Sequence, residues 1–221
     1  PCASMDTYDP KTVFSSIANM GRDAYCNQPS ITEWDLSRFA ECLIPLINRD
    51  QDQAIKSATK LINTFEKKYE ERWMSMMRKK LGLQGTDDKD KFLIVDLLTW
   101  MHQNKVDYTN TFCYLMDLKE YDDDIYKDND FQNWKKNWRE RLRLNDNNPE
   151  KYISLMRTVN PLVIPRNNKV EKALEFAEKG DYSFLKKIIS ILKEPYKLSQ
   201  DKLDYQNPGP QQKNYQTFCG T

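Results

Sequence analysis

Apolar residues recur every three or four positions through almost the whole of this 221-residue chain, and only six glycines interrupt them. That spacing lines one face of an α-helix, whereas the alternating runs typical of β-strands are missing. The clearest case is the segment between Asn129 and Leu144, where Phe131, Trp134 and Trp138 form an aromatic stripe. The pattern predicts an all-α fold with a sizeable core.

Turn and cap residues predict where the helices begin and end. Ser30-Ile31-Thr32-Glu33 has the form of a capping box, so a helix with one broad apolar face is expected from there to about Ile47. A longer second helix is expected to begin near Gln51, run through Met76 or Met77 and end before Gly82 and Gly85. Further helices are predicted from Asp87 or Asp88 through Met101, from a Thr109 cap through Met116, from Pro149 through Met156, from Asn167 to Gly180, and from an Asp181 cap through Leu192.

Two stretches are expected to lie outside helices. The segment from Asn160 to Arg166 contains two prolines and is predicted to be extended. From Pro195 onward the chain is polar and lacks periodicity, so an extended C-terminal tail is expected there.

The charge balance argues against two classes of partner. Thirty-four basic residues against thirty-three acidic ones leave a net charge of +1, so no global field attracts nucleic acid or an anionic membrane. No run approaches the ~20 apolar residues that a membrane-spanning helix needs. We therefore expect a soluble protein that binds neither nucleic acid nor a membrane.

The five cysteines are scattered, without a CxxC pair or a zinc-binding spacing, which suits a reducing compartment. Cys42 and Cys113 lie in apolar helical stretches, where cysteine usually acts as a small buried hydrophobe. Cys219, three residues from the end, is expected to be exposed. It is either a redox or nucleophilic thiol or an incidental cysteine.

Other residues with chemical potential are better explained structurally. Glycine-rich phosphate loops are absent, and the single histidine, His102, is expected at the surface near a helix end. The acidic stretch Asp122 to Asp130 lacks the glycine and glutamate of an EF-hand and is interpreted as a solvated loop. Trp134 and Trp138 could stack nucleic-acid bases, but a core stripe is the favoured interpretation. From the residues alone, this is a soluble helical domain of unknown role.

Ordered local strings carry a resemblance to a known family. They are Pro1-Cys2-Ala3-Ser4-Met5-Asp6-Thr7-Tyr8-Asp9-Pro10, Gly21-Arg22-Asp23-Ala24-Tyr25-Cys26-Asn27-Gln28-Pro29, Trp34-Asp35-Leu36-Ser37-Arg38-Phe39-Ala40, Met156-Arg157-Thr158-Val159-Asn160-Pro161, Arg166-Asn167, Glu178-Lys179-Gly180-Asp181-Tyr182-Ser183 and Pro195-Tyr196. In this order they resemble the selenoprotein O family, which is called YdiU in bacteria. Cys219 also matches the family's selenocysteine or cysteine third from the end, although Gly220-Thr221 replaces its two serines.

The resemblance implies a protein-kinase-like fold that transfers AMP from ATP, with Mg²⁺ or Mn²⁺, to Ser, Thr or Tyr hydroxyls of protein substrates. In the family the catalytic, ATP-binding and metal-binding residues lie upstream of the proline that matches Pro1. The chain starts without an initiator methionine, which we interpret as a cut. No catalytic, cofactor-binding or metal-binding residue is therefore assigned, and the missing N-terminal lobe of the same chain is the expected partner. Cys219 is the one candidate redox residue, with Cys2 or Cys26 as its disulfide partner.

The sequence thus predicts the all-α, helical C-terminal lobe of a kinase-like adenylyltransferase over residues 1–196, followed by an extended tail over 197–221. The expected location is cytoplasmic in a bacterium and mitochondrial in a eukaryote. This fragment alone is expected to be inactive, and an unusually apolar surface is expected on it. The alternative is a stand-alone helical protein-interaction module.

Overall fold

A computed structural model describes residues 4–15, 20–116, 124–144, 148–197, 199 and 202–209. Within these ranges the chain is helical and forms no strand, apart from two isolated antiparallel bridges, Thr7 with Asp107 and Val13 with Ala24. The all-α prediction is confirmed there. The elements are η1 Tyr25–Asn27, α1 Gln28–Ile47, α2 Gln51–Ile62, α3 Phe65–Lys80, α4 Asp90–Asn104, α5 Tyr108–Leu115, η2 Asp124–Lys127, α6 Asn129–Arg143, α7 Pro149–Arg157, α8 Asn167–Glu178, α9 Ser183–Leu192 and α10 Leu203–Gln206.

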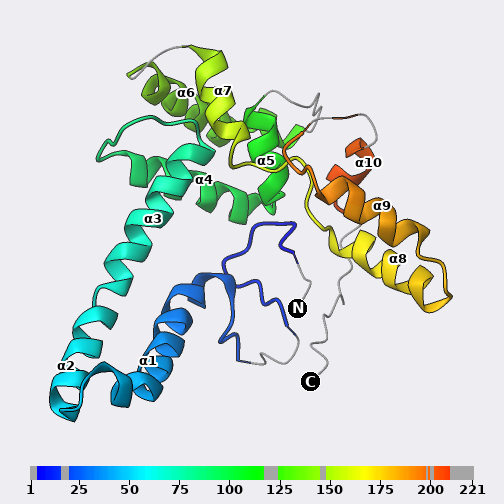
Figure 1. Ribbon diagram of the computed structural model, residues 1–221. Coiled ribbons are helices and arrows are strands. Elements are labelled where there is room, and N and C mark those ends of the chain that lie inside the picture. The colour runs from blue at the N-terminus through cyan, green and yellow to red at the C-terminus, as the bar shows by residue number, and fades with distance from the viewer. Residues whose placement is uncertain are drawn as a thin grey trace.

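Helix α4 lies at the centre of the helical body, packed between α3 and α6 (Figure 1). Seven of its fifteen residues are buried, among them Ile94, Leu97 and Met101 with no exposed surface. Because these apolar groups leave water together with those of α5, α6 and α7, this body holds the main hydrophobic core.

The aromatic stripe of α6 faces that core, as predicted. Trp134 and Trp138 are stacked with ring centroids 6.0 Å apart. Each indole nitrogen donates to a backbone carbonyl, Trp134 to Leu93 and Trp138 to Leu81, both at 2.8 Å. Buried tryptophans with satisfied N–H groups are core residues. These rings are not available to stack on bases.

The prediction of one long helix from Gln51 is wrong, because the structure divides this stretch into α2 and α3 at Asn63 and Thr64. The Thr64 hydroxyl donates to the Leu61 carbonyl at 2.7 Å and so competes with the helical backbone bonds. Helix α3 then runs from the body to the α1–α2 pair, which projects away from it as an arm (Figure 1).

Two expectations for helix α1, the Ser30 cap and the burial of Cys42, are wrong. It begins at Gln28, with Pro29 in its first turn, and the Ser30 hydroxyl donates to the Asn27 carbonyl instead of capping the helix. Its broad apolar face is not buried, since none of its twenty residues is buried. Cys42 is exposed for the same reason, whereas Cys113 is buried as predicted.

The other helices lie close to their predicted positions. Helix α4 begins at Asp90, and α5 is capped by Asp107 rather than Thr109, because the Asp107 carboxylate accepts from the Asn110 amide at 2.7 Å. Gly180, with φ of +82°, ends the α8 segment of the α8–α9 hairpin, as expected of a glycine in this conformation.

The segment before α8 is extended, as predicted. Part of the predicted C-terminal tail differs, because Leu203–Gln206 forms the short helix α10. This stretch is held to the body, where Gln206 is buried. No helix among the described residues is long and apolar enough to span a bilayer.

Candidate functional site

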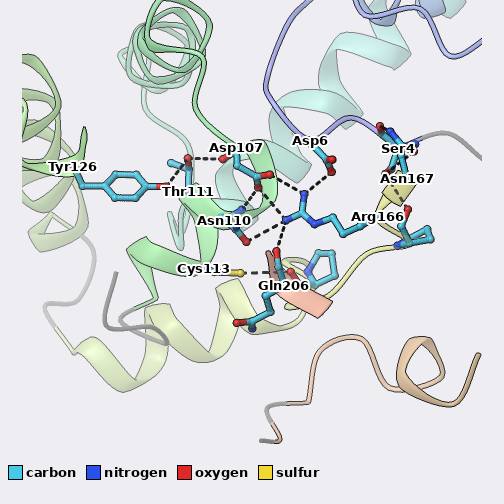
Figure 2. A network of polar contacts seen from close by, with 12 residues as sticks. Ser4, Asp6, Asp107, Asn110, Thr111, Cys113, Tyr126, Arg166, Asn167 and Gln206 are labelled. Carbon is cyan, nitrogen blue, oxygen red and sulfur yellow. Dashed lines mark hydrogen bonds and ion pairs between the residues drawn. The ribbon is translucent and has the colours of Figure 1, made fainter. Parts of the chain in front are cut away.

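The Arg166 guanidinium joins three parts of the chain that are far apart in sequence, as Figure 2 shows. One terminal nitrogen, Nη1, donates to Asp6 Oδ1 at 2.6 Å and to Asp107 Oδ2 at 2.7 Å. The other, Nη2, lies 3.2 Å from Asp107 Oδ1 and 3.2 Å from Asn110 Oδ1, and it donates to the Gln206 carbonyl at 2.8 Å. We call these five residues the arginine clamp.

Local sequence positions each member of the clamp. Arg166 ends the extended segment before α8, so its side chain can reach the body without belonging to a helix face. Asp107 caps α5 through Oδ1, and its second oxygen, Oδ2, accepts from Arg166 Nη1. Asn110 follows in the first turn of the same helix.

The N-terminal segment is attached at several points besides Asp6. The Tyr8 amide donates to the Val106 carbonyl at 2.9 Å, and the Tyr108 amide donates to the Asp6 carbonyl at 2.8 Å. The Ser4 amide also donates to the Asn167 carboxamide at 2.8 Å, and Asn167 Nδ2 donates back to the Ser4 carbonyl at 2.9 Å. Residues 4–8 are thus fixed along the start of α5 and the start of α8.

The clamp places charges in a dry environment. The Arg166 side chain is 1% exposed, Asp107 11% and Asp6 25%. Burial lowers the pKa of Arg166, but the carboxylates of Asp107 and Asp6 more than offset this, so the pKa lies above its ordinary value. Burial raises the pKa of Asp107, against the opposing effect of Arg166. Removing one partner would leave a buried charge without compensation.

A second buried cation, Lys80, lies at the end of α3. Its ammonium donates to Asn160 Oδ1 at 2.8 Å, and Asn160 Nδ2 donates back to the Lys80 carbonyl at 2.9 Å. The ammonium also lies 4.3 Å from the centre of the Phe112 ring. Burial lowers its pKa to about 8.

A third polar cluster joins α3, α4 and α6. Asp90, with no exposed surface, accepts from Arg78 Nε at 2.6 Å and from Arg141 Nε at 2.7 Å. Burial raises the pKa of Asp90, but hydrogen bonds from Arg141 and Arg78 outweigh it and hold the pKa below its ordinary value. All three clusters hold segments together rather than presenting a reactive group to solvent.

The candidate residues named from sequence are not brought together by the described part of the structure. Cys219 and Cys2 lie outside it, and Cys26 is exposed at η1, so the redox role of Cys219 stays a prediction. His102 lies at the surface near the end of α4, as expected, with Nδ1 3.7 Å from Asp9 Oδ1.

The acidic stretch divides into residues inside and outside the described ranges. Asp122 and Asp123 lie outside them. Asp128 is a structural residue, because its carboxylate caps α6 at Phe131 and accepts from the Trp100 indole at 2.8 Å. The described residues contain no group of three or more His, Cys, Asp or Glu side chains that could hold a metal ion.

The arginine clamp was missed in the sequence, although its members stand in the quoted strings. Asp6 belongs to the first of them, and Arg166 opens the pair Arg166-Asn167. The available signal was an arginine placed directly after the apolar run from Leu162 to Pro165, because arginine is rarely buried without a partner.

A family model and the curated relatives all point to one protein family. The family model described as protein adenylyltransferase SelO matches residues 1–193. A protein nucleotidyltransferase YdiU of Pelagibacter ubique is 52% identical over 222 residues, covering 100% of this chain and 46% of the relative. YdiU proteins of Nitrosococcus oceani and Alcanivorax borkumensis are 44% and 47% identical, with 100% of this chain and 45% and 46% of those relatives covered. The chain spans about half the length of these curated relatives.

Proposed function

The chain belongs to the SelO family of protein adenylyltransferases, and we propose that it acts as the helical C-terminal part of an enzyme that transfers AMP from ATP to Ser, Thr or Tyr hydroxyls of proteins. The observation that carries this proposal is the family match over residues 1–193, which includes Asp6, Asp107 and Arg166. In this reaction the acceptor hydroxyl loses its proton and its oxygen bonds to the α-phosphorus, while the bond from the α-phosphorus to the α,β-bridging oxygen breaks and pyrophosphate leaves with that oxygen.

ATP and Mg²⁺ or Mn²⁺ are the cofactors that this reaction would use, since a divalent cation neutralises the triphosphate charge. Among the described residues, no three His, Cys, Asp or Glu side chains gather where they could hold a metal ion. We therefore assign no ligand of the cation to this chain and derive no step through it. The kinase-like arrangement of the whole enzyme belongs to the same proposal.

The role that the chain's own residues support is structural positioning. The arginine clamp and the Ser4–Asn167 pair fix residues 4–8 on the helical body. Two backbone hydrogen bonds and the Asp6–Arg166 ion pair therefore restrain both the backbone and a side chain of this segment. We propose that the body thereby supports the acceptor side of the enzyme, while the chemistry is performed by residues outside this chain.

The test compares a full-length protein of this family carrying this segment with the 221-residue chain alone. With ATP labelled in the α-phosphate, the full-length protein is expected to label protein hydroxyls in a divalent-cation-dependent reaction, and the chain alone is not. A parallel reaction uses ATP labelled in the γ-phosphate. Transfer of that label to protein would show a kinase and contradict the proposal. AMP transfer by the chain alone would contradict the assignment of the chemistry to residues outside it.

A stand-alone helical interaction module is the second candidate, and the exposed apolar residues of α1 favour it. Phe39 is 60% exposed and Leu46 81% exposed. A full-length protein that shows no AMP transfer to any acceptor, but whose α1 variants lose binding to a protein partner, would support this alternative.

A further inference from the structure

Helix α1 carries an apolar stripe that is largely exposed among the described residues. Leu36, Phe39, Leu43 and Leu46 are spaced by three, four and three residues, so they line one side of the helix. Leu36 is 37%, Phe39 60% and Leu46 81% exposed, and Leu43 is half-buried. We call these four residues the α1 stripe.

The stripe is separate from the side of α1 that is already packed. Ala40 and Ile44 are half-buried and line the groove between α1 and α2. Arg38 pairs with Glu41 at 2.7 Å, so the neighbouring charges are paired with each other. Helix α1 thus packs one side against α2 and part of α3, and the α1 stripe lies beside that packed side.

An apolar surface of this kind indicates a missing partner. A helix gains most of its stability in a protein from burying its apolar face, and α1 buries none of its twenty residues. The three-four-three spacing is that of helices that pack along each other. The occupant that fits this spacing is another helix with an apolar stripe of its own.

Two observations favour a helix from the same polypeptide over a second copy. The curated relatives are about twice as long as this chain, so much of a family member's length lies outside the structure. A second apolar patch, Phe92 and Leu144, each 72% exposed, lies in the body, where both residues line one groove between α4 and the end of α6. A two-fold dimer through α1 would leave that patch bare, whereas the remaining half of a family member's length can cover both surfaces.

We propose that the α1 stripe is the docking surface for a helix in the part of the family's polypeptide that this chain does not span. The arm of α1 and α2 is then not a free projection but the element that joins the two halves of the protein. This inference concerns assembly and does not depend on AMP transfer.

Cys42 offers a direct probe of this surface. It lies three residues after Phe39 and four before Leu46, next to the stripe, and its thiol is exposed in the chain. In the full-length protein, native alkylation of Cys42 by a maleimide, located by peptide mass spectrometry, is compared with alkylation of the same residue in urea. A docked helix is expected to slow the native reaction at least about tenfold, because thiol reactivity requires access.

Two variants separate docking from a general loss of structure. Phe39→Arg, on the stripe, is expected to restore the rate of Cys42 to nearly its urea value while the α4–α7 body remains folded. Leu174→Arg, at a position 51% exposed on α8, is the matched control and should leave the protection unchanged.

Two outcomes would overturn the proposal. In the first, Cys42 in the native full-length protein reacts as fast as in urea, so the stripe is open or awaits a separate protein. In the second, protection of Cys42 rises with protein concentration together with a dimer seen by light scattering, so a second copy covers the stripe.

Discussion

Helices α4 and α1 are both rich in large apolar residues, yet their environments are opposite. Helix α4 buries seven of fifteen residues, whereas α1 buries none of twenty. The difference lies in their neighbours, because α4 packs between α3 and α6 while α1 meets mainly α2 and part of α3. Apolar periodicity therefore indicates a face that will be buried but not whether the partner lies in the same stretch of chain.

Replacing the central cation of the clamp should give the largest effect in this comparison. Arg166→Ala leaves the Asp6 and Asp107 carboxylates without their partner in a buried site, which costs about 3–5 kcal/mol of the free energy of unfolding. Arg38→Ala in the arm, whose pair with Glu41 is exposed on both sides, is expected to change it by less than about 1 kcal/mol. Urea denaturation followed by circular dichroism measures both, and similar losses would refute the contrast.

Removing one apolar side chain from α4 and one from α1 tests the contrast between the two helices directly. Leu97→Ala in α4, at a position with no exposed surface, should destabilise the chain by about 2–5 kcal/mol through lost contacts and a cavity. Leu46→Ala in α1, which is 81% exposed, should stay within about 0.5 kcal/mol in the chain alone. In the full-length protein the second value should rise if the α1 stripe is docked, which thermal unfolding of both proteins would detect.

The buried ammonium of Lys80 predicts a pH dependence of the body that the arm lacks. Its pKa is lowered from 10.5 to about 8 in the folded chain, so between these values the unfolded chain binds more protons and stability rises with pH. From about pH 7.5 to about pH 9.5 the gain should be about 2 kcal/mol.

Lys80→Met supplies the control, because it removes the titrating group but keeps an apolar stem of similar length. The unfolding free energy of the original chain minus that of the variant should therefore rise by about 2 kcal/mol across that window. Taking the difference cancels the tyrosines Tyr8 and Tyr108, whose pKa values burial raises. A difference that does not change with pH would show that Lys80 is hydrated in the folded chain.

The sequence predicted the body better than the arm, for a physical reason. The helices α6 and α7 and the hairpin of α8 and α9 follow from local periodicity, Pro149 and Gly180, and the structure confirms them. The break between α2 and α3 was missed, since Asn63 and Thr64 interrupt the backbone without glycine or proline.

The clamp could not be predicted from local pattern. Asp6 and Arg166 are 160 positions apart, and Asp107 contacts Arg166 across 59 positions. No periodicity connects such residues, because their meeting depends on how the extended segment before α8 crosses the start of α5. Similarly, nothing local distinguishes the exposed α1 stripe from the buried face of α4.

Removing one helix cap from each region should have the smallest effect, and it tests whether the arm unfolds independently of the body. Asp50 caps α2 by accepting from the Asp52 and Gln53 amides at 3.0 and 3.2 Å, and Asn148 caps α7 by accepting from the Glu150 amide at 3.0 Å. Replacing either with alanine removes about 1 kcal/mol of helix stability.

Because the arm shares few buried contacts with the body, it should open in a separate local step. Asp50→Ala is therefore expected to speed amide hydrogen exchange in α1 and α2 without moving the main unfolding transition, whereas Asn148→Ala should move that transition. An equal shift of the main transition by both variants would mean that arm and body unfold as one cooperative unit.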